Sequence, residues 1–240
     1  MSLDNISIVL NQPQGDLNVG SVCRAMMNFG VTNLIFVNPS ADYLGLQARK
    51  MALKAEKLLH NAKVYDNLKD ALADFNIAIG TSVRHGKYRK DFFTPDKVSE
   101  FIYERFSDNR IALVFGREDS GLSTDDLDLC QHFITIPTND MFTSMNLSHS
   151  VTVILYELSK FVNNKSFNVK RKKLAENSEI ENLYEHMKKT MSEIEFLDPQ
   201  NPDHIMRTFK KIYGRSELDK REVSILHGLM SKIEWFINKG

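Results

Sequence analysis

The chain has 240 residues, of which 42% are hydrophobic and 26% charged, and its 31 basic residues balance its 31 acidic ones. This composition is typical of a globular protein and excludes a wholly disordered chain, and no apolar run approaches the roughly 18 residues that a membrane span needs. Two cysteines and an N-terminus unlike a signal peptide favour a reduced, cytoplasmic protein without a disulfide framework or a cysteine zinc site.

Short apolar segments alternate with helix-like stretches over the first two thirds of the chain. The segments are β-branched and bounded by Gly, Pro, Asn or Asp, and they are predicted as strands at 6–10, 34–37, 63–65, 77–79, 111–115 and 133–136. Helix signals lie between them. Such alternation predicts an α/β domain with a mostly parallel sheet and helices on both faces, and ligands of such sheets bind beyond the carboxyl ends of the strands.

Three of the helix signals are specific. The helix predicted over 18–29 ends at Gly30, which suits a left-handed cap. Thr94-Pro95 supplies a cap residue followed by proline at the first helical position, and Ser123 with Asp126 resembles a capping box. After the last predicted strand, apolar positions on one face predict a long helix over 147–162.

The composition changes after this long helix. Residues 163–173 are polar and basic, and from Ser178 onward only helix patterns appear, at 179–196, 202–213 and 217–237, with Gly214 as a stop signal. The sequence therefore predicts three parts, namely an α/β domain over 1–163, a basic linker over 164–177 and a small all-helical region over 178–240.

Two apparent catalytic motifs fail on spacing. The stretch 80–87 looks like a phosphate-binding loop but has one residue too many, and Tyr88 stands where Ser or Thr would bind magnesium. Ser120 is followed by glycine as in a nucleophile elbow, but Glu118 occupies the position of the required preceding glycine. The histidines show no metal spacing. An NTPase site, a serine hydrolase site and a metal site are therefore unsupported.

Three loops that follow strands carry residues suited to chemistry. The first includes Asn18 and Arg24, the second spans 115–122 with two glycines, and the third spans 136–148 with several hydroxyls and an amide. Each loop has a purely structural alternative: an amphipathic helix with an exposed arginine, a tight strand-to-helix turn, and a helix cap at Ser144 or Asn146. The residues alone leave these alternatives open.

Together the three loops resemble the three sequence motifs of the SPOUT methyltransferases, and more narrowly those of the branch that methylates ribose 2′-hydroxyls of tRNA and rRNA. The matching strings are N-x-G-x-x-x-R-A-M-x-N-F-G from Asn18, L-V-F-G-R-E-x-x-G-L from Leu113 and S-x-N-L-S from Ser144. The C-terminal helices also resemble the tail of a bacterial tRNA enzyme in this branch, which modifies cytidine or uridine at position 32 of the anticodon loop.

The resemblance implies an α/β fold with a deep trefoil knot at the carboxyl end of a catalytic domain over 1–163, and a tRNA-binding extension over 178–240. It implies S-adenosylmethionine as cofactor, tRNA as substrate and a homodimer, with no metal and no membrane. The cofactor-binding residues that it implies are Thr81, Ser82, Val83, Gly116, Ile136, Thr143, Ser144 and Met145.

The same resemblance implies the catalytic residues. Arg24 would orient the hydroxyl, since a guanidinium stays protonated in ordinary surroundings and is a poor base. Asn18 would hold the RNA or Arg24, and Glu118 would pair with Arg24. Ser144 and Asn146 would lie at the reacting centre.

Two alternative functions remain, an rRNA 2′-O-methyltransferase and an RNA-binding homologue without catalytic activity. The basic cluster Arg84, Lys87, Arg89 and Lys90 is either an RNA contact or a solvated loop. The zero net charge conceals an uneven distribution: residues 1–163 carry 16 Lys and Arg against 19 Asp and Glu, and residues 164–240 carry 15 against 12. RNA binding requires a basic surface only locally.

Overall fold

The first two thirds of the chain form a parallel β-sheet. The computed structural model describes residues 3–82, 92–163 and 172–239, and within them the sheet has seven strands in the order β3-β2-β1-β6-β4-β7-β5. All pairings are parallel. The bounds are β1 (Ile6–Asn11), β2 (Asn33–Val37), β3 (Lys63–Tyr65), β4 (Ile77–Thr81), β5 (Phe92–Phe93), β6 (Ile111–Phe115) and β7 (His132–Ile134).

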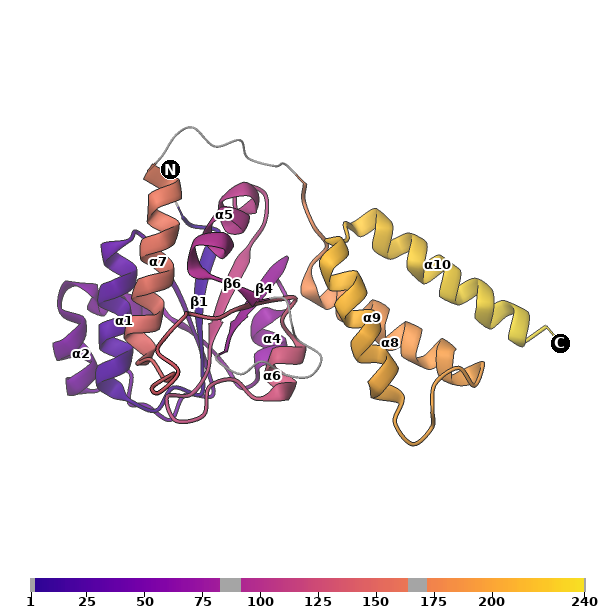
Figure 1. Cartoon of the computed structure of the whole chain (residues 1–240), viewed down its shortest axis with the longest axis horizontal. Helices are drawn as coiled ribbons and strands as arrows, with labels where there is room; N and C mark the ends of the chain where they lie inside the picture. The colour runs from indigo at the N-terminus through magenta and orange to yellow at the C-terminus, as the bar shows by residue number, and fades with distance from the viewer. Residues whose placement is uncertain (1–2, 83–91, 164–171, 240) are drawn as a thin grey trace.

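Helices cover both faces of this sheet, as predicted. One face packs against α1 (Asp16–Asn28), α2 (Leu46–Ala52), α3 (Glu56–Asn61), α5 (Pro95–Arg105) and α7 (Leu147–Asn163), with a 3-10 turn (Leu53–Ala55) between α2 and α3. The other face packs against α4 (Leu68–Leu72) and α6 (Thr124–Asp128). Side chains alternate between the two cores because successive residues of a strand point to opposite faces. Figure 1 shows α1 and α7 side by side, away from α4 and α6.

Two of the three helix signals are confirmed in detail and the third in part. Gly30 has φ 74° just after α1, a backbone conformation that glycine adopts without strain. Ser123 and Asp126 form the capping box of α6. Pro95 begins α5, although the Thr94 hydroxyl donates to the Asp96 carboxylate and does not cap the helix.

Two predicted boundaries were wrong and one strand was missed, for identifiable reasons. The last strand ends at Ile134 and not at Ile136, shortly before Pro137, which has no N–H with which to continue the ladder. The two-residue strand β5 was missed because so short a segment has no periodicity. Gly214 does not stop its helix, which continues to Ser216 and ends where Glu217 has φ 49°.

The C-terminal part forms a separate all-helical unit, as predicted. Its helices are α8 (Asn177–Glu193), α9 (Pro202–Ser216) and α10 (Lys220–Ile237). They share their own apolar core, which includes Leu183, Met187, Met206, Val223 and Met230. No helix in the described ranges is long and apolar enough to cross a bilayer.

Two buried asparagines hold this unit against the sheet domain. The Asn109 side chain accepts from Leu174 N at 2.8 Å and donates to Lys172 O at 2.9 Å, and Asn76 Nδ2 donates to Leu174 O at 2.8 Å. Beside them, Arg105 of α5 reaches Glu217 with Nε to Oε1 at 2.6 Å. These bonds satisfy the backbone of residues 172–174 where it approaches the sheet domain.

His132 of β7 lies close to this seam, against the rings of Phe93 and Phe101 at centroid distances of 5.8 and 4.6 Å. Burial lowers the pKa of His132 to about 4. The negative charge of Glu217 raises this pKa and the positive charge of Arg105 lowers it, both to a smaller extent than burial does. A histidine whose pKa is lower in the folded than in the unfolded protein stabilises the fold at pH values above the unfolded pKa of about 6.5. This contribution is lost as the pH falls toward the folded pKa.

We therefore expect the free energy of unfolding to fall by roughly 1–2 kcal/mol more in the wild type than in His132→Phe between about pH 7 and pH 5. Urea unfolding at a series of pH values measures this difference. His149→Asn serves as the control, since His149 is a histidine exposed at the start of α7. Parallel profiles for the wild type and His132→Phe would contradict the assignment.

Candidate active site

The polar loops predicted from the sequence meet at one edge of the sheet. Leu10 of β1 lies beside Phe115 of β6, and Gly80 of β4 lies beside both Val114 of β6 and Phe133 of β7. Because these strands are parallel, the loops that follow them leave the sheet on the same side. The start of α1, the loop 116–123 and the segment 135–146 are thereby brought together.

Glu118 binds the start of α1. Its carboxylate accepts hydrogen bonds from Gln14 N at 2.9 Å, Gly15 N at 3.0 Å and Asn18 Nδ2 at 3.1 Å. A carboxylate at the N-terminus of a helix is stabilised by the free N–H groups there. The second loop is therefore fixed to the first by a charged acceptor with three donors.

Asn146 extends this connection to the third loop. Its Nδ2 donates to Asn18 Oδ1 at 2.8 Å, while its Oδ1 accepts from Ser148 N at 2.9 Å at the start of α7. The helix-cap alternative for Asn146 is thus correct but incomplete, because the same amide also joins Asn18. Glu118, Asn18 and Asn146 form one hydrogen-bonded chain, hereafter the amide relay, that crosses all three loops.

The predicted pair between Glu118 and Arg24 does not form, because Glu118 is occupied by the N-terminus of α1 and by Asn18. Asn18 likewise binds the relay and not Arg24. Arg24 is exposed on α1, and within the described part of the chain it makes no hydrogen bond or ion pair. The fold leaves its guanidinium available to a ligand.

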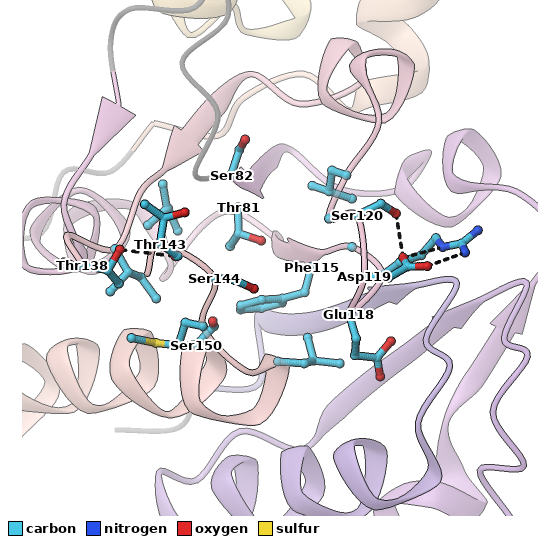
Figure 2. A pocket seen from close by; sticks show the side chains of 18 residues that line it. Thr81, Ser82, Phe115, Glu118, Asp119, Ser120, Thr138, Thr143, Ser144 and Ser150 are labelled. Atoms are coloured by element: carbon cyan, nitrogen blue, oxygen red, sulfur yellow. Dashed lines mark hydrogen bonds and ion pairs between the residues drawn. The ribbon is translucent and has the colours of Figure 1, made fainter. Parts of the chain in front are cut away.

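A pocket of about 400 Å³ opens beside Glu118, at the ends of β4, β6 and β7. Figure 2 shows the side chains that line it. Seven of the eight predicted cofactor residues line it, namely Thr81, Ser82, Gly116, Ile136, Thr143, Ser144 and Met145. Val83 and the basic cluster 84–90 lie outside the described residues. Two predicted catalytic residues, Ser144 and Glu118, also line the pocket, whereas Arg24, Asn18 and Asn146 do not.

Ten further residues that line the pocket were not among the predicted site residues. The additional lining residues come from the ends of β6 and β7, from the loop 116–122 and from the start of α7: Phe115, Arg117, Asp119, Ser120, Gly121, Leu122, Ile134, Thr138, Leu147 and Ser150. Most of them belong to the same loops, so the rule that ligands bind beyond strand ends would have found them. Ser150 carries no such signal, since it lies within α7 and outside the matching strings.

The loop 116–122 is folded tightly on itself. Gly121 N donates to Arg117 O at 2.9 Å, and the Arg117 guanidinium binds Asp119 through Nε at 3.1 Å and Nη2 at 2.9 Å. The hydrogen bond and charge of Arg117 hold the pKa of Asp119 at about 2. A β-carbon on Gly116 would lie 2.2 Å from the Gly121 carbonyl carbon, so only glycine allows this closure.

Comparison with known proteins assigns the chain to a family. The model of the SpoU rRNA Methylase family matches residues 5–156, and the model of the tRNA methyltransferase TrmJ C-terminal domain matches residues 178–239. The chain is 33% identical to tRNA (cytidine/uridine/adenosine-2′-O-)-methyltransferase TrmJ of Pseudomonas aeruginosa, over 97% of this chain and 95% of that protein. It is 32% identical to tRNA (cytidine/uridine-2′-O-)-methyltransferase TrmJ of Citrobacter koseri, over 97% of each chain.

A solved structure agrees with these matches. The crystal structure of TrmJ from Z. mobilis ZM4 superposes with a TM-score of 0.82 at 29% identity, and the match covers 95% of this chain and 98% of that one. The family match covers the sheet domain, including all three loops of the amide relay and the lining of the pocket up to Ser150. The chain therefore belongs to the SpoU rRNA Methylase family.

Proposed function

We propose that the protein transfers a methyl group from S-adenosylmethionine to a ribose 2′-hydroxyl of tRNA, at cytidine or uridine 32 of the anticodon loop. The observation that carries this proposal is the amide relay, which joins the three methyltransferase motifs beside the 400 Å³ pocket. The relatives named for tRNA 2′-O-methylation support the substrate, since they match over the sheet domain and the helical unit alike.

The pocket fits S-adenosylmethionine in size and chemistry. Its volume of about 400 Å³ lies within the usual range for small-molecule sites, and its wall combines apolar side chains with exposed hydroxyls. Phe115, Ile134 and Ile136 would face the adenine, while Thr143 and Ser144 offer hydroxyls to the polar groups. When bound, the cofactor supplies an activated methyl group on a sulfonium.

The side chains around the pocket then act chiefly by positioning. The amide relay holds loops 116–123 and 135–146 at fixed places, so the reacting atoms can be held in line. Ser144 offers a hydroxyl at the pocket wall. We assign to Arg24 the binding of the target nucleotide, through a guanidinium that can orient the hydroxyl and offset negative charge.

The helical unit supplies a basic surface for tRNA. Arg207, Lys211 and Arg215 are exposed on α9 at a spacing of four residues, which places them along one side of the helix. Arg207 also contacts Asp128 of α6 at 3.2 Å, so this basic stripe adjoins the helix that follows the pocket loop. We propose that residues 178–240 bind tRNA and that residues 164–177 link them to a catalytic domain over 1–163. Phosphates of the tRNA would contact the basic stripe on α9.

We further propose a homodimer formed through the surface of α1 and α7. Leu17, Arg24 and Met27 fall on one side of α1, and the exposed Tyr156 of α7 contacts Phe29 just beyond α1 edge-to-face at 6.4 Å. Large apolar side chains gathered on one face are typical of an interaction surface. Arg24 would then lie at the subunit boundary, beside a pocket that its own side chain does not line.

The decisive test supplies unmodified tRNA transcripts and methyl-labelled S-adenosylmethionine, followed by nucleoside mass spectrometry. We expect 2′-O-methylcytidine or 2′-O-methyluridine at position 32, and no product from a matched transcript with a 2′-deoxyribose at that nucleotide. Label in rRNA alone would favour the rRNA alternative. Cofactor binding without label in any RNA would favour a homologue that binds RNA without catalysis.

A further inference from the structure

The end of α10 carries exposed aromatic rings beside lysines. Trp235 and Phe236 keep 46% and 64% of their surface exposed, and their rings meet edge-to-face with centroids 5.0 Å apart. The Lys232 Nζ lies 3.7 Å from the centroid of the Trp235 ring, and the Lys239 Nζ lies 4.4 Å from it. We call these four residues the aromatic–lysine cluster. Figure 1 places this end of α10 on the side away from the sheet domain.

The rings of the cluster lie outside the apolar core of the helical unit. The residues of α10 that face its core are Val223, Leu226, Met230 and Ile233, which recur at helical spacing along a different side of the helix. Trp235 and Phe236 are absent from that core. Large aromatic side chains that are exposed outside the core are typical of an interaction surface.

The two lysines give the cluster a positive charge. Neither Lys232 nor Lys239 has an ion pair with any carboxylate of the described chain. The nearest acid in sequence, Glu234, is directed to the opposite side, where Lys189 Nζ and Thr190 Oγ1 bind it at 3.1 Å each. Both ammonium groups contact the Trp235 ring and no carboxylate of the described residues, so they can still meet the anionic part of a ligand.

This chemistry favours single-stranded nucleic acid over a protein partner. Exposed aromatic rings stack on unpaired bases, and adjacent lysines neutralise the phosphates on either side. A protein partner would bury both lysines, which is costly unless counter-charges meet them, and lysine is depleted from protein interfaces.

We propose that the aromatic–lysine cluster is a stacking platform for an unpaired nucleotide of the RNA substrate. This inference rests on the proposed tRNA function, and it assigns the cluster to substrate affinity and not to methyl transfer. The platform lies in the helical unit, apart from the pocket at the sheet edge, and none of its residues lines that pocket.

The single tryptophan of the chain is Trp235, so its fluorescence reports on this surface alone. We expect tRNA to quench this emission with saturation, and S-adenosylmethionine to leave it unchanged. Trp235→Ala should raise the KM for tRNA roughly 5- to 100-fold with kcat and cofactor affinity unchanged, the range expected for loss of one stacked base. Trp235→Phe, which keeps a ring, should restore most of the affinity.

The matched control is Ile225→Ala, since Ile225 is an exposed apolar residue near the other end of α10 and should not affect tRNA binding. Circular dichroism checks that each variant remains folded. Unchanged KM in Trp235→Ala, with no quenching at tRNA concentrations that saturate a filter-binding assay, would overturn the platform. A shift of Trp235→Ala from dimer to monomer in sedimentation, again with unchanged KM, would overturn it in favour of a protein interface.

The two proposals fail separately in these measurements. If the wild type binds tRNA and is quenched by it but methylates no transcript, the proposed function is wrong and the platform stands. If the wild type methylates tRNA while Trp235→Ala behaves like it, the platform is wrong and the function stands.

Discussion

Replacing Arg24 with alanine is expected to slow methyl transfer about 100-fold or more while leaving the affinity for S-adenosylmethionine within about twofold. Arg24 is exposed on α1 and does not line the pocket, so its removal deletes no cofactor contact. It also leaves the amide relay intact, because Glu118 and Asn18 bind each other and not Arg24. The loss should therefore appear in the chemical step and in tRNA binding alone.

Single-turnover methylation with labelled cofactor measures the rate, and calorimetry measures cofactor affinity. Arg24→Lys should recover only part of the rate, since a lysine keeps the charge but lacks the planar pair of donors. Arg49→Ala is the matched control, because Arg49 is exposed on α2 and has only a 3.7 Å contact with Glu56. Full activity of Arg24→Ala would refute the role assigned to this side chain.

Gly116→Ala is expected to weaken cofactor binding by about 100-fold or more, because the added carbon cannot be accommodated without opening the loop 116–122. That carbon would lie 2.2 Å from the Gly121 carbonyl carbon and 2.3 Å from Leu122 N, and both are backbone atoms. Opening the loop also displaces Glu118, so the anchor at the start of α1 is lost together with the pocket wall.

Calorimetric titration with S-adenosylmethionine and thermal unfolding test this expectation together. Gly228→Ala is the control, since nothing lies within 4 Å of its added carbon and alanine favours a helix interior. It should be neutral or slightly stabilising and should bind the cofactor normally. If Gly116→Ala also bound the cofactor normally, the loop would not be closed as described.

The fold was largely predictable because its strongest signals are local. Apolar strand segments and caps such as Gly30 and Ser123 depend on nearby residues and appear in the sequence. The errors arose where a distant partner decides a boundary. The two-residue strand β5, for example, exists through its pairing with β7. The trefoil knot, which only the family resemblance implied, stays a prediction.

The sequence predicted which residues lie at the candidate site but not which of them bind one another. The motif strings identified Asn18, Glu118 and Asn146, and the cofactor residues that lie in described loops all line one pocket. The partners within the site were assigned wrongly, since Glu118 was expected to bind Arg24 and instead binds the start of α1. Which donor reaches a carboxylate depends on distances of a few tenths of an ångström, and no residue spacing contains that information.

The amino-acid sequence by itself determined the α/β class and the helical C-terminal unit, because periodicity and caps are properties of neighbouring residues. The residues proposed to carry the chemistry came from the resemblance of three motif strings to those of a known family. Only the tertiary structure decided that β6 inserts between β1 and β4, that Asn146 both caps α7 and binds Asn18, and that Trp235 stays outside the core. Each of these depends on groups far apart in the chain, whose approach is set by packing and by the need to pair buried polar atoms.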